Sequence, residues 1–111
     1  MSDQNTLYPI FLKLSELRVL IVGGGFVAEE KLHFLLKSSP DAVVTMVATY
    51  YRSGTQEIAL GGKVTLHTKP FEPEDLKGYQ LVIAATDDEA VNHLIYLICR
   101  KRGILVNVAD N

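Results

Sequence analysis

The feature that most constrains the fold is a glycine-rich turn between two segments of different periodicity. A β-branched and aliphatic run at 18–22 leads into three consecutive glycines and then into a helical pattern. Gly23, Gly25 and Ala28 fit the G-x-G-x-x-G/A spacing, which combines a tight turn, close backbone approach to a pyrophosphate and close helix–strand packing. The following helix would point unpaired N–H groups and its positive dipole end at phosphates. The turn favours a dinucleotide site, although any tight strand-to-helix turn also needs small residues.

Length and composition indicate one folded domain. The chain has 111 residues, of which 48% are hydrophobic and 22% charged, a balance typical of a globular protein with a single core. Its formal net charge is −2 and its pI is about 5.9. Proteins that bind nucleic acid usually carry a clustered basic face, so we expect no nucleic-acid partner.

The sequence also predicts a soluble, cytoplasmic protein. Cys99 is the only cysteine, which excludes an internal disulfide and fits a reducing compartment. Residues 1–6 lack the basic start and apolar core of a secretory signal. The longest apolar run, 19–28, is far shorter than the roughly 20 residues of a membrane helix, so we expect no membrane partner.

Strand-like and helix-like segments alternate along the chain with short connections. We expect strands at 18–22, 43–47, 64–67, 81–84 and 104–108, preceded by an extended lead-in at 10–14. A first helix is expected to begin at Ala28, a short second helix to lie near 56–60, and a last helix to end at Gly103. One more helical turn is expected within 70–78. For the last helix, the expected buried stripe is Val91, Leu94, Ile95 and Ile98.

This alternation predicts an α/β, Rossmann-like three-layer fold over residues 1–111. Five parallel strands joined by right-handed crossovers give the order 3-2-1-4-5. A ligand is expected at the carboxyl edge, where the first and fourth strands diverge.

Several candidate site residues converge on that edge. We expect the cofactor to be bound by Gly23, Gly25, Phe26, Val27, Thr49, Tyr50, Thr86, Asp87 and Asn107. Thr86 and Glu89 also satisfy a T-x-x-E capping box, so the run at 86–89 has an equally good explanation as a helix start.

One element of a dinucleotide site is missing. Domains that bind NAD usually place Asp or Glu about 20 residues after the glycines, to hold the adenosine ribose. Here the corresponding positions, 44–48, carry no acid. Backbone amides or Thr49 would serve instead. The nearest arginine is Arg52, so the sequence does not choose between NAD and NADP.

No metal site is predicted. The histidines and Cys99 fall on different expected elements. His93 and Cys99 share one helix, but six positions put them roughly 120° apart around it. His33 is expected to face solvent, and Cys99 to be a small packing group.

Five blocks carry a resemblance to a known family. They are Tyr-Pro-Ile-Phe-Leu at 8–12, Val-Gly-Gly-Gly-Phe-Val-Ala at 22–28 with Lys31, Lys-Pro-Phe-Glu-Pro-Glu-Asp-Leu at 69–76, Val-Ile-Ala-Ala-Thr-Asp-Asp at 82–88 with Asn92, and Asn-Val-Ala-Asp at 107–110. In this order they resemble the N-terminal NAD-binding domain of siroheme synthase and the stand-alone precorrin-2 dehydrogenases, some of which are also sirohydrochlorin ferrochelatases. The family usually continues after the second strand with proline and an acidic or polar residue, where this chain has Thr49-Tyr50-Tyr51.

The resemblance implies NAD-dependent oxidation of the tetrapyrrole precorrin-2 to sirohydrochlorin, a step toward sirohaem. The family's catalytic aspartate, also tied to iron insertion, matches Asp110, which could act as general base. In the family a further segment follows, with dimerisation elements and a helical domain, whereas this sequence stops at Asn111. We therefore expect a homodimer only in the longer family context, and from these 111 residues alone weak NAD binding with little or no turnover.

Two other functions stay open. A non-catalytic nucleotide-sensing module would share the fold, but such modules usually keep the acid after the second strand. The chain could also be the NAD domain of an unrelated dehydrogenase, with the match at 107–110 accidental.

Overall fold

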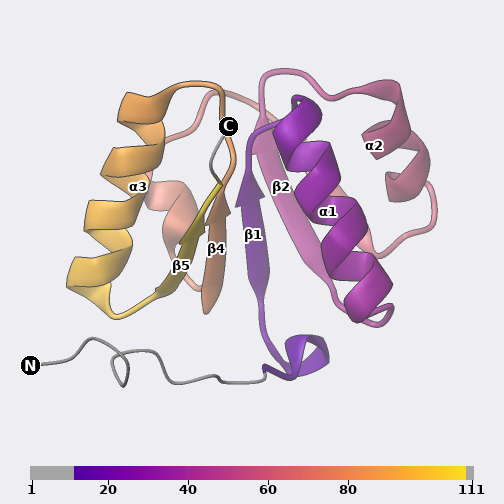
Figure 1. The fold of residues 1–111 in the computed structure, drawn as a ribbon, viewed down its shortest axis with the longest axis horizontal. Helices are drawn as coiled ribbons and strands as arrows, with labels where there is room; N and C mark the ends of the chain where they lie inside the picture. The colour runs from indigo at the N-terminus through magenta and orange to yellow at the C-terminus, as the bar shows by residue number, and fades with distance from the viewer. Residues whose placement is uncertain (1–11, 110–111) are drawn as a thin grey trace, which may run out of the picture.

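A computed structural model describes residues 12–109 and shows a five-stranded parallel sheet (Figure 1). The strands are β1 (Val19–Val22), β2 (Val44–Ala48), β3 (Val64–Thr68), β4 (Leu81–Ala84) and β5 (Leu105–Val108). They lie in the order β3-β2-β1-β4-β5. The predicted α/β, Rossmann-like fold and its strand order are confirmed.

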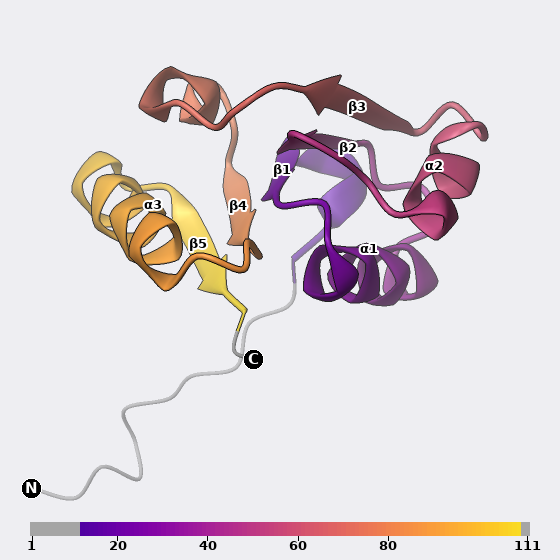
Figure 2. The same ribbon diagram turned by 90° about the horizontal axis from the view of Figure 1, so that it is seen from above.

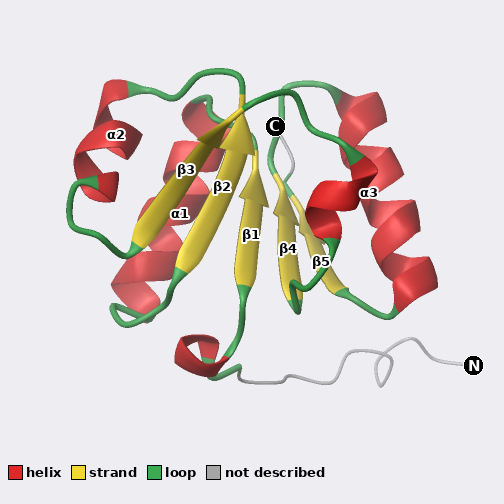
Figure 3. Cartoon of the chain, turned by 180° about the vertical axis from the view of Figure 1, so that it is seen from behind, coloured by secondary structure: helices red, strands yellow, loops and turns green. Residues whose placement is uncertain are grey.

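Helices cover both faces of the sheet, so the domain has three layers (Figures 2 and 3). On one face lie α1 (Phe26–Ser38) and α2 (Ser53–Ala59). The other face carries α3 (Glu89–Arg102) and the 3₁₀ helix η3 (Pro73–Leu76). A second short 3₁₀ helix, η2 (Leu14–Glu16), precedes β1. Right-handed crossovers require this change of face when the chain passes from β3 to β4.

Strand β1 is buried on both sides, which explains its uninterrupted apolar sequence. Ile21 packs in one core cluster with Leu32 of α1, and Leu20 packs in the other with Leu76 of η3 and Ile95 of α3. All four β1 side chains are at most 1% exposed. Burying each such side chain stabilises the fold by about 1.5–3 kcal/mol, so β1 holds the two helical layers together.

The expected elements differ from the observed ones mainly at their ends. Residues 14–16 form a 3₁₀ helix rather than part of an extended lead-in, and residues 10 and 11 lie outside the described part of the chain. Arg18 is exposed and precedes β1, and its backbone N–H donates to Gln80 Oε1 at 2.8 Å. Helix α2 begins at Ser53, earlier than predicted, and its buried residue is the polar Thr55. Because this short helix buries a threonine, its sequence shows little of the apolar periodicity that predicts a helix.

The start of α3 also corrects the sequence analysis. Its N-cap is Asp88, whose side chain accepts hydrogen bonds from the backbone N–H groups of Ala90 and Val91, so the expected Thr86–Glu89 capping box does not form. The helix ends at Gly103 in the left-handed conformation, with φ of 72°, as predicted. Its buried residues are Asn92, Ile95 and Cys99, whereas Leu94 of the expected stripe is 45% exposed.

Candidate functional site

A cavity of about 550 Å³ opens at the carboxyl ends of the strands. Its walls come from the glycine turn with the start of α1, the end of β2, the loop after β3 and the loop after β4. The lining residues are 22–27, 47–50, 69–71, 85–88 and Val91. A volume between roughly 300 and 1,000 Å³ is typical of small-molecule sites. The cavity lies at the edge where β1 and β4 diverge, as the strand order predicts.

The first two glycines of the turn are required by close backbone contacts. Gly23 has φ of +132°, and a Cβ there would overlap the carbonyl of Ala85. Its N–H donates to Val47 O at 2.9 Å. A Cβ at Gly24 would overlap the carbonyl oxygen of Tyr50. The tight turn predicted for Gly23 is thus present, and Gly24, to which the motif assigned no role, lets the segment after β2 approach.

Gly25 leaves the start of α1 open to the cavity. It is the N-cap of α1 and supplies no side-chain hydrogen bond to the first turn. A Cβ at Gly25 would lie 3.2 Å from Tyr50 Oη, with no backbone within 4 Å. The unpaired N–H groups and positive end of a helix attract anions. The first residues of α1, Phe26 and Val27, also line the cavity, so the site fits a pyrophosphate.

The end of β2 is anchored by a buried tyrosine. Tyr51 is 8% exposed, and its hydroxyl lies 2.6 Å from His67 O and 3.1 Å from Met46 O. Burial raises the pKa of Tyr51 to about 12, so the hydroxyl is neutral and can donate. This anchor fixes the chain beside Thr49 and Tyr50, which line the cavity.

Arg52, the nearest arginine, is engaged with α1. Its Nε lies 3.1 Å from Glu29 Oε1, and its guanidinium lies 5.5 Å from the centre of the Phe26 ring. The hydroxyl of Thr55 donates to the other Glu29 oxygen at 3.4 Å. The charge of Arg52 is therefore balanced by Glu29. Arg52 is also not among the residues that line the cavity.

A buried amide shapes the loop after β4. Asn92 is 4% exposed. Its Oδ1 accepts from the Thr86 backbone N–H at 3.1 Å and lies 2.6 Å from the Thr86 hydroxyl, while its Nδ2 donates to Thr86 O at 3.1 Å. One side chain therefore fixes both the N–H and the C=O of Thr86 at the cavity rim.

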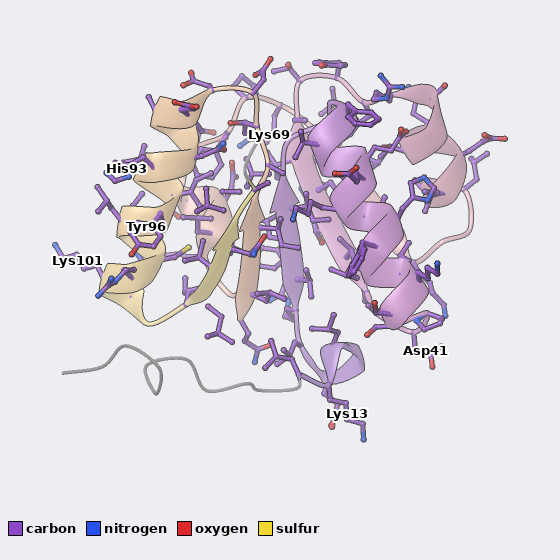
Figure 4. All side chains as sticks on the ribbon, in the orientation of Figure 1. Lys13, Asp41, Lys69, His93, Tyr96 and Lys101 are labelled. Atoms are coloured by element: carbon purple, nitrogen blue, oxygen red, sulfur yellow. The ribbon has the colours of Figure 1, made fainter. Side chains whose placement is uncertain are left out.

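Sequence analysis missed the wall formed by Lys69, Pro70 and Phe71. These residues follow β3, and the Lys69 backbone N–H donates to Ala48 O of β2 at 2.9 Å. Figure 4 places Lys69 near the carboxyl ends of the strands. Their sequence block contributed to the family resemblance, and that was the only signal that could have pointed to them.

Comparisons with known proteins agree with this geometry. Residues 10–111 match a protein family described as "Putative NAD(P)-binding". The chain belongs to this NAD(P)-binding family. It is 49% identical over 102 residues to the siroheme synthase of Methylococcus capsulatus and 45% identical over 104 residues to that of Pseudoalteromonas atlantica. These matches cover 92% and 94% of this chain but only 21% and 22% of the two relatives.

A solved structure is also similar. It is that of SirC, a precorrin-2 dehydrogenase, with a TM-score of 0.81 and 30% sequence identity. The match covers 95% of this chain and 50% of that one. The resemblance to the NAD-binding domain of siroheme synthase and precorrin-2 dehydrogenase is therefore confirmed, and the chain spans about a fifth of the length of the siroheme synthases it matches.

The NAD(P)-binding domain brings most of the predicted cofactor residues together. Eight of the nine line the cavity, namely Gly23, Gly25, Phe26, Val27, Thr49, Tyr50, Thr86 and Asp87. Asn107 does not: it lies exposed on β5 opposite Ile83 of β4. Asp110, the predicted catalytic residue, lies outside the described residues. The cofactor roles of these nine residues and the catalytic role of Asp110 stay predictions.

The described residues hold neither a cluster of metal ligands nor a membrane-spanning helix. Between 12 and 109, no three or more His, Cys, Asp or Glu side chains are grouped to hold a metal ion. No helix in the same range has the length and apolar character needed to cross a bilayer. His33 is exposed and Cys99 fully buried, as their sequence positions predicted.

Proposed function

We propose that this chain is the nucleotide-binding domain of an NAD-dependent precorrin-2 dehydrogenase, an oxidoreductase that converts precorrin-2 to sirohydrochlorin in sirohaem biosynthesis. One observation carries the proposal. The uncapped start of α1, behind Gly25, opens into a cavity of nucleotide size. That arrangement occurs in a chain 30% identical to a precorrin-2 dehydrogenase over 95% of its own length.

The described residues suit each part of NAD. The backbone N–H groups at Phe26 and Val27 would hold the pyrophosphate, because α1 begins there without a side-chain cap. Thr49 and Tyr50, which follow β2 and line the cavity, would hold the adenosine. Thr86, fixed by Asn92, would contact the nicotinamide half together with Asp87.

The oxidation removes one hydride and one proton from precorrin-2. A bound nicotinamide ring supplies the hydride acceptor. Asp110, which follows Ala109 in the sequence, would take the proton as general base. Thr86 and Asp87, which line the cavity, would hold the nicotinamide ring in place for the hydride transfer.

The rest of the proposal concerns the longer protein. In a longer protein, Asp110 would also accept protons from pyrrole nitrogens in sirohydrochlorin ferrochelatase activity, and the protein would form a homodimer. The matched siroheme synthase extends well beyond the 102 residues of the match. We also propose a cytoplasmic location, which the fully buried free thiol of Cys99 suits. These 111 residues would contribute nucleotide binding, and the remainder would complete the tetrapyrrole site.

Nucleotide binding is tested by calorimetric titration of NAD⁺ into the chain and into two matched glycine variants. A Cβ would lie 3.2 Å from Tyr50 Oη at Gly25 and 3.3 Å from Ile58 O at Gly61. Gly25→Ala should weaken NAD⁺ binding about tenfold or more, because the methyl group occupies the phosphate approach. Gly61→Ala should leave it unchanged. No NAD⁺ binding by the wild-type chain, or equal effects of the two variants, would contradict the proposal.

Catalysis is tested in a chimera. The matched 102 residues of the Methylococcus capsulatus siroheme synthase are replaced by this chain, and NADH formation from precorrin-2 is followed. The chimera should oxidise precorrin-2, and Asp110→Asn should abolish turnover while NAD⁺ binding persists. A chimera that folds and binds NAD⁺ but forms no NADH would support a nucleotide-sensing module instead.

A further inference from the structure

The adenosine end of the cavity lacks the acid that dinucleotide folds usually carry after the second strand. Positions 44–48 carry no acid, and Thr49 and Tyr50 follow them directly. On this side, the described lining residues include one charged residue, Lys69. The Lys69 backbone is bonded to the last residue of β2, Ala48, at 2.9 Å, so Lys69 stands next to the position of the missing acid.

Two carboxylates hold the Lys69 ammonium. Its Nζ contacts Asp75 Oδ2 and lies 3.2 Å from Glu72 Oε1. Asp75 is itself fixed, because its Oδ2 also accepts the Glu72 backbone N–H at 2.8 Å within the capping box of η3. The hydrogen bond that Lys69 donates to Asp75 raises the pKa of Lys69. Burial opposes ionisation of Asp75, but its bonds to Lys69 and to the Glu72 N–H lower its pKa overall, so both groups are charged at neutral pH.

The cluster of Lys69, Glu72 and Asp75 has two properties that affect how it would bind a nucleotide ribose. An ammonium has three N–H donors, and the two carboxylates take two of them, which leaves a third for another acceptor. One positive and two negative groups leave a net charge of −1. A ribose 2′-hydroxyl is neutral and can accept the free donor, whereas a 2′-phosphate brings additional negative charge beside an already negative cluster.

Arg52, the other cation near this end, does not reverse that balance. Its Nε is paired with Glu29 at 3.1 Å, and the Glu29 side chain is only 14% exposed. The two charges cancel locally. The cluster around Lys69 therefore sets the sign of the charge at the ribose.

We propose that Lys69, with Glu72 and Asp75, binds the adenosine ribose and selects NAD over NADP, in place of the acid absent after β2. This inference rests on the proposed nucleotide site. It assigns selectivity to the loop between β3 and η3, a different part of the chain from the usual second-strand position.

The test compares two charge reversals, one at the N-cap of η3 and one within η3. The Glu72 and Glu74 side chains are 68% and 77% exposed. Glu72 also takes part in the capping box of η3, so circular dichroism first checks that both variants are folded. Only Glu72 pairs with Lys69; Glu74 pairs with Lys77 at 3.5 Å. Dissociation constants for NAD⁺ and NADP⁺ are measured by calorimetry on the wild-type chain and both variants, at low and at high salt.

The wild-type chain should bind NAD⁺ more tightly than NADP⁺. Glu72→Lys should lower the NADP⁺-to-NAD⁺ ratio of dissociation constants about tenfold, and Glu74→Lys by no more than about twofold, with the difference shrinking at high salt. Binding of NADP⁺ at least as tight as NAD⁺ by the wild-type chain, or equal shifts in the two variants, would overturn the inference alone. Failure of the wild-type chain to bind NAD⁺ would overturn the proposed function and this inference with it.

Discussion

The backbone of Gly24 lies directly against the carbonyl of Tyr50, leaving no room for a Cβ. The same contact is reinforced by the Arg52 N–H, which donates to Gly24 O at 3.2 Å. The glycine turn after β1 and the segment after β2 are therefore packed as one unit. Both segments line the cavity, so their contact holds two of its walls together.

Gly24→Ala should destabilise the protein by about 1–3 kcal/mol, since the added methyl group would force the two segments apart. The free energy of unfolding is measured by urea denaturation followed by circular dichroism. Gly61→Ala serves as the control, because its Cβ would meet only Ile58 O at 3.3 Å. Equal stability of the two variants would show that the contact is easily relieved.

Asn92→Asp should destabilise the protein by about 1–3 kcal/mol near neutral pH, because the carboxylate cannot donate to Thr86 O and is buried. Burial should raise the pKa of the new carboxyl in the folded state. Stability should thus be better preserved below its unfolded pKa and be lost as the pH rises through the folded value. Asn107→Asp makes the same chemical change at an exposed site and should have little effect. Urea denaturation at several pH values checks both variants, and a pH-independent loss would refute the argument.

Tyr51 should govern the alkaline stability of the protein. Its pKa rises from 10.0 to about 12 on folding, so the neutral form is favoured in the native state. Stability should therefore fall as the pH rises from 10.0 toward about 12. Tyr51→Phe should lack this part of the decline and cost about 1 kcal/mol at neutral pH. Tyr50→Phe, at a side chain that is 60% exposed, is the control, and alkaline urea denaturation is the measurement.

The interaction energy between Lys69 and Asp75 should depend on pH. Because the pKa of Asp75 is lowered on folding, its contribution is present above the ordinary value of 3.8 and is lost as the pH falls through the folded value. The pKa of Lys69 is raised, so its contribution persists below 10.5 and disappears as the pH rises through the folded value. A double-mutant cycle of Lys69→Met and Asp75→Asn should show favourable coupling at neutral pH and none in strong acid. Coupling that survives acid would have to be non-ionic.

Much of the fold could be predicted from the sequence because its signals are local. The β-branched run ending at Val22, the glycines after it and the stop at Gly103 each reflect backbone preferences of a few residues. Right-handed crossovers, together with the dinucleotide-type glycine turn, then favour the order 3-2-1-4-5. The strand Leu81–Ala84 matches its predicted range, since its apolar run begins directly after the polar Gln80 and stops just before Thr86.

The parts that could not be predicted depend on tertiary contacts. Thr86 fits a capping box by spacing, but the buried amide of Asn92 occupies its backbone and leaves the cap to Asp88. Lys69 reaches the cavity because its backbone is bonded to β2, a contact between distant segments that no local pattern encodes. Leu94 fits a helical stripe, yet α3 is turned so that Cys99 faces the sheet.

Because of its position, the reactivity of Cys99 reports whether α3 is packed against the sheet. The sulfur is fully enclosed between α3 and the sheet, and burial raises the pKa of the thiol, so a thiol-reactive dye finds neither access nor thiolate in the native state. Dye attachment can proceed only when α3 separates from the sheet. The rate of labelling therefore reports how often that layer opens.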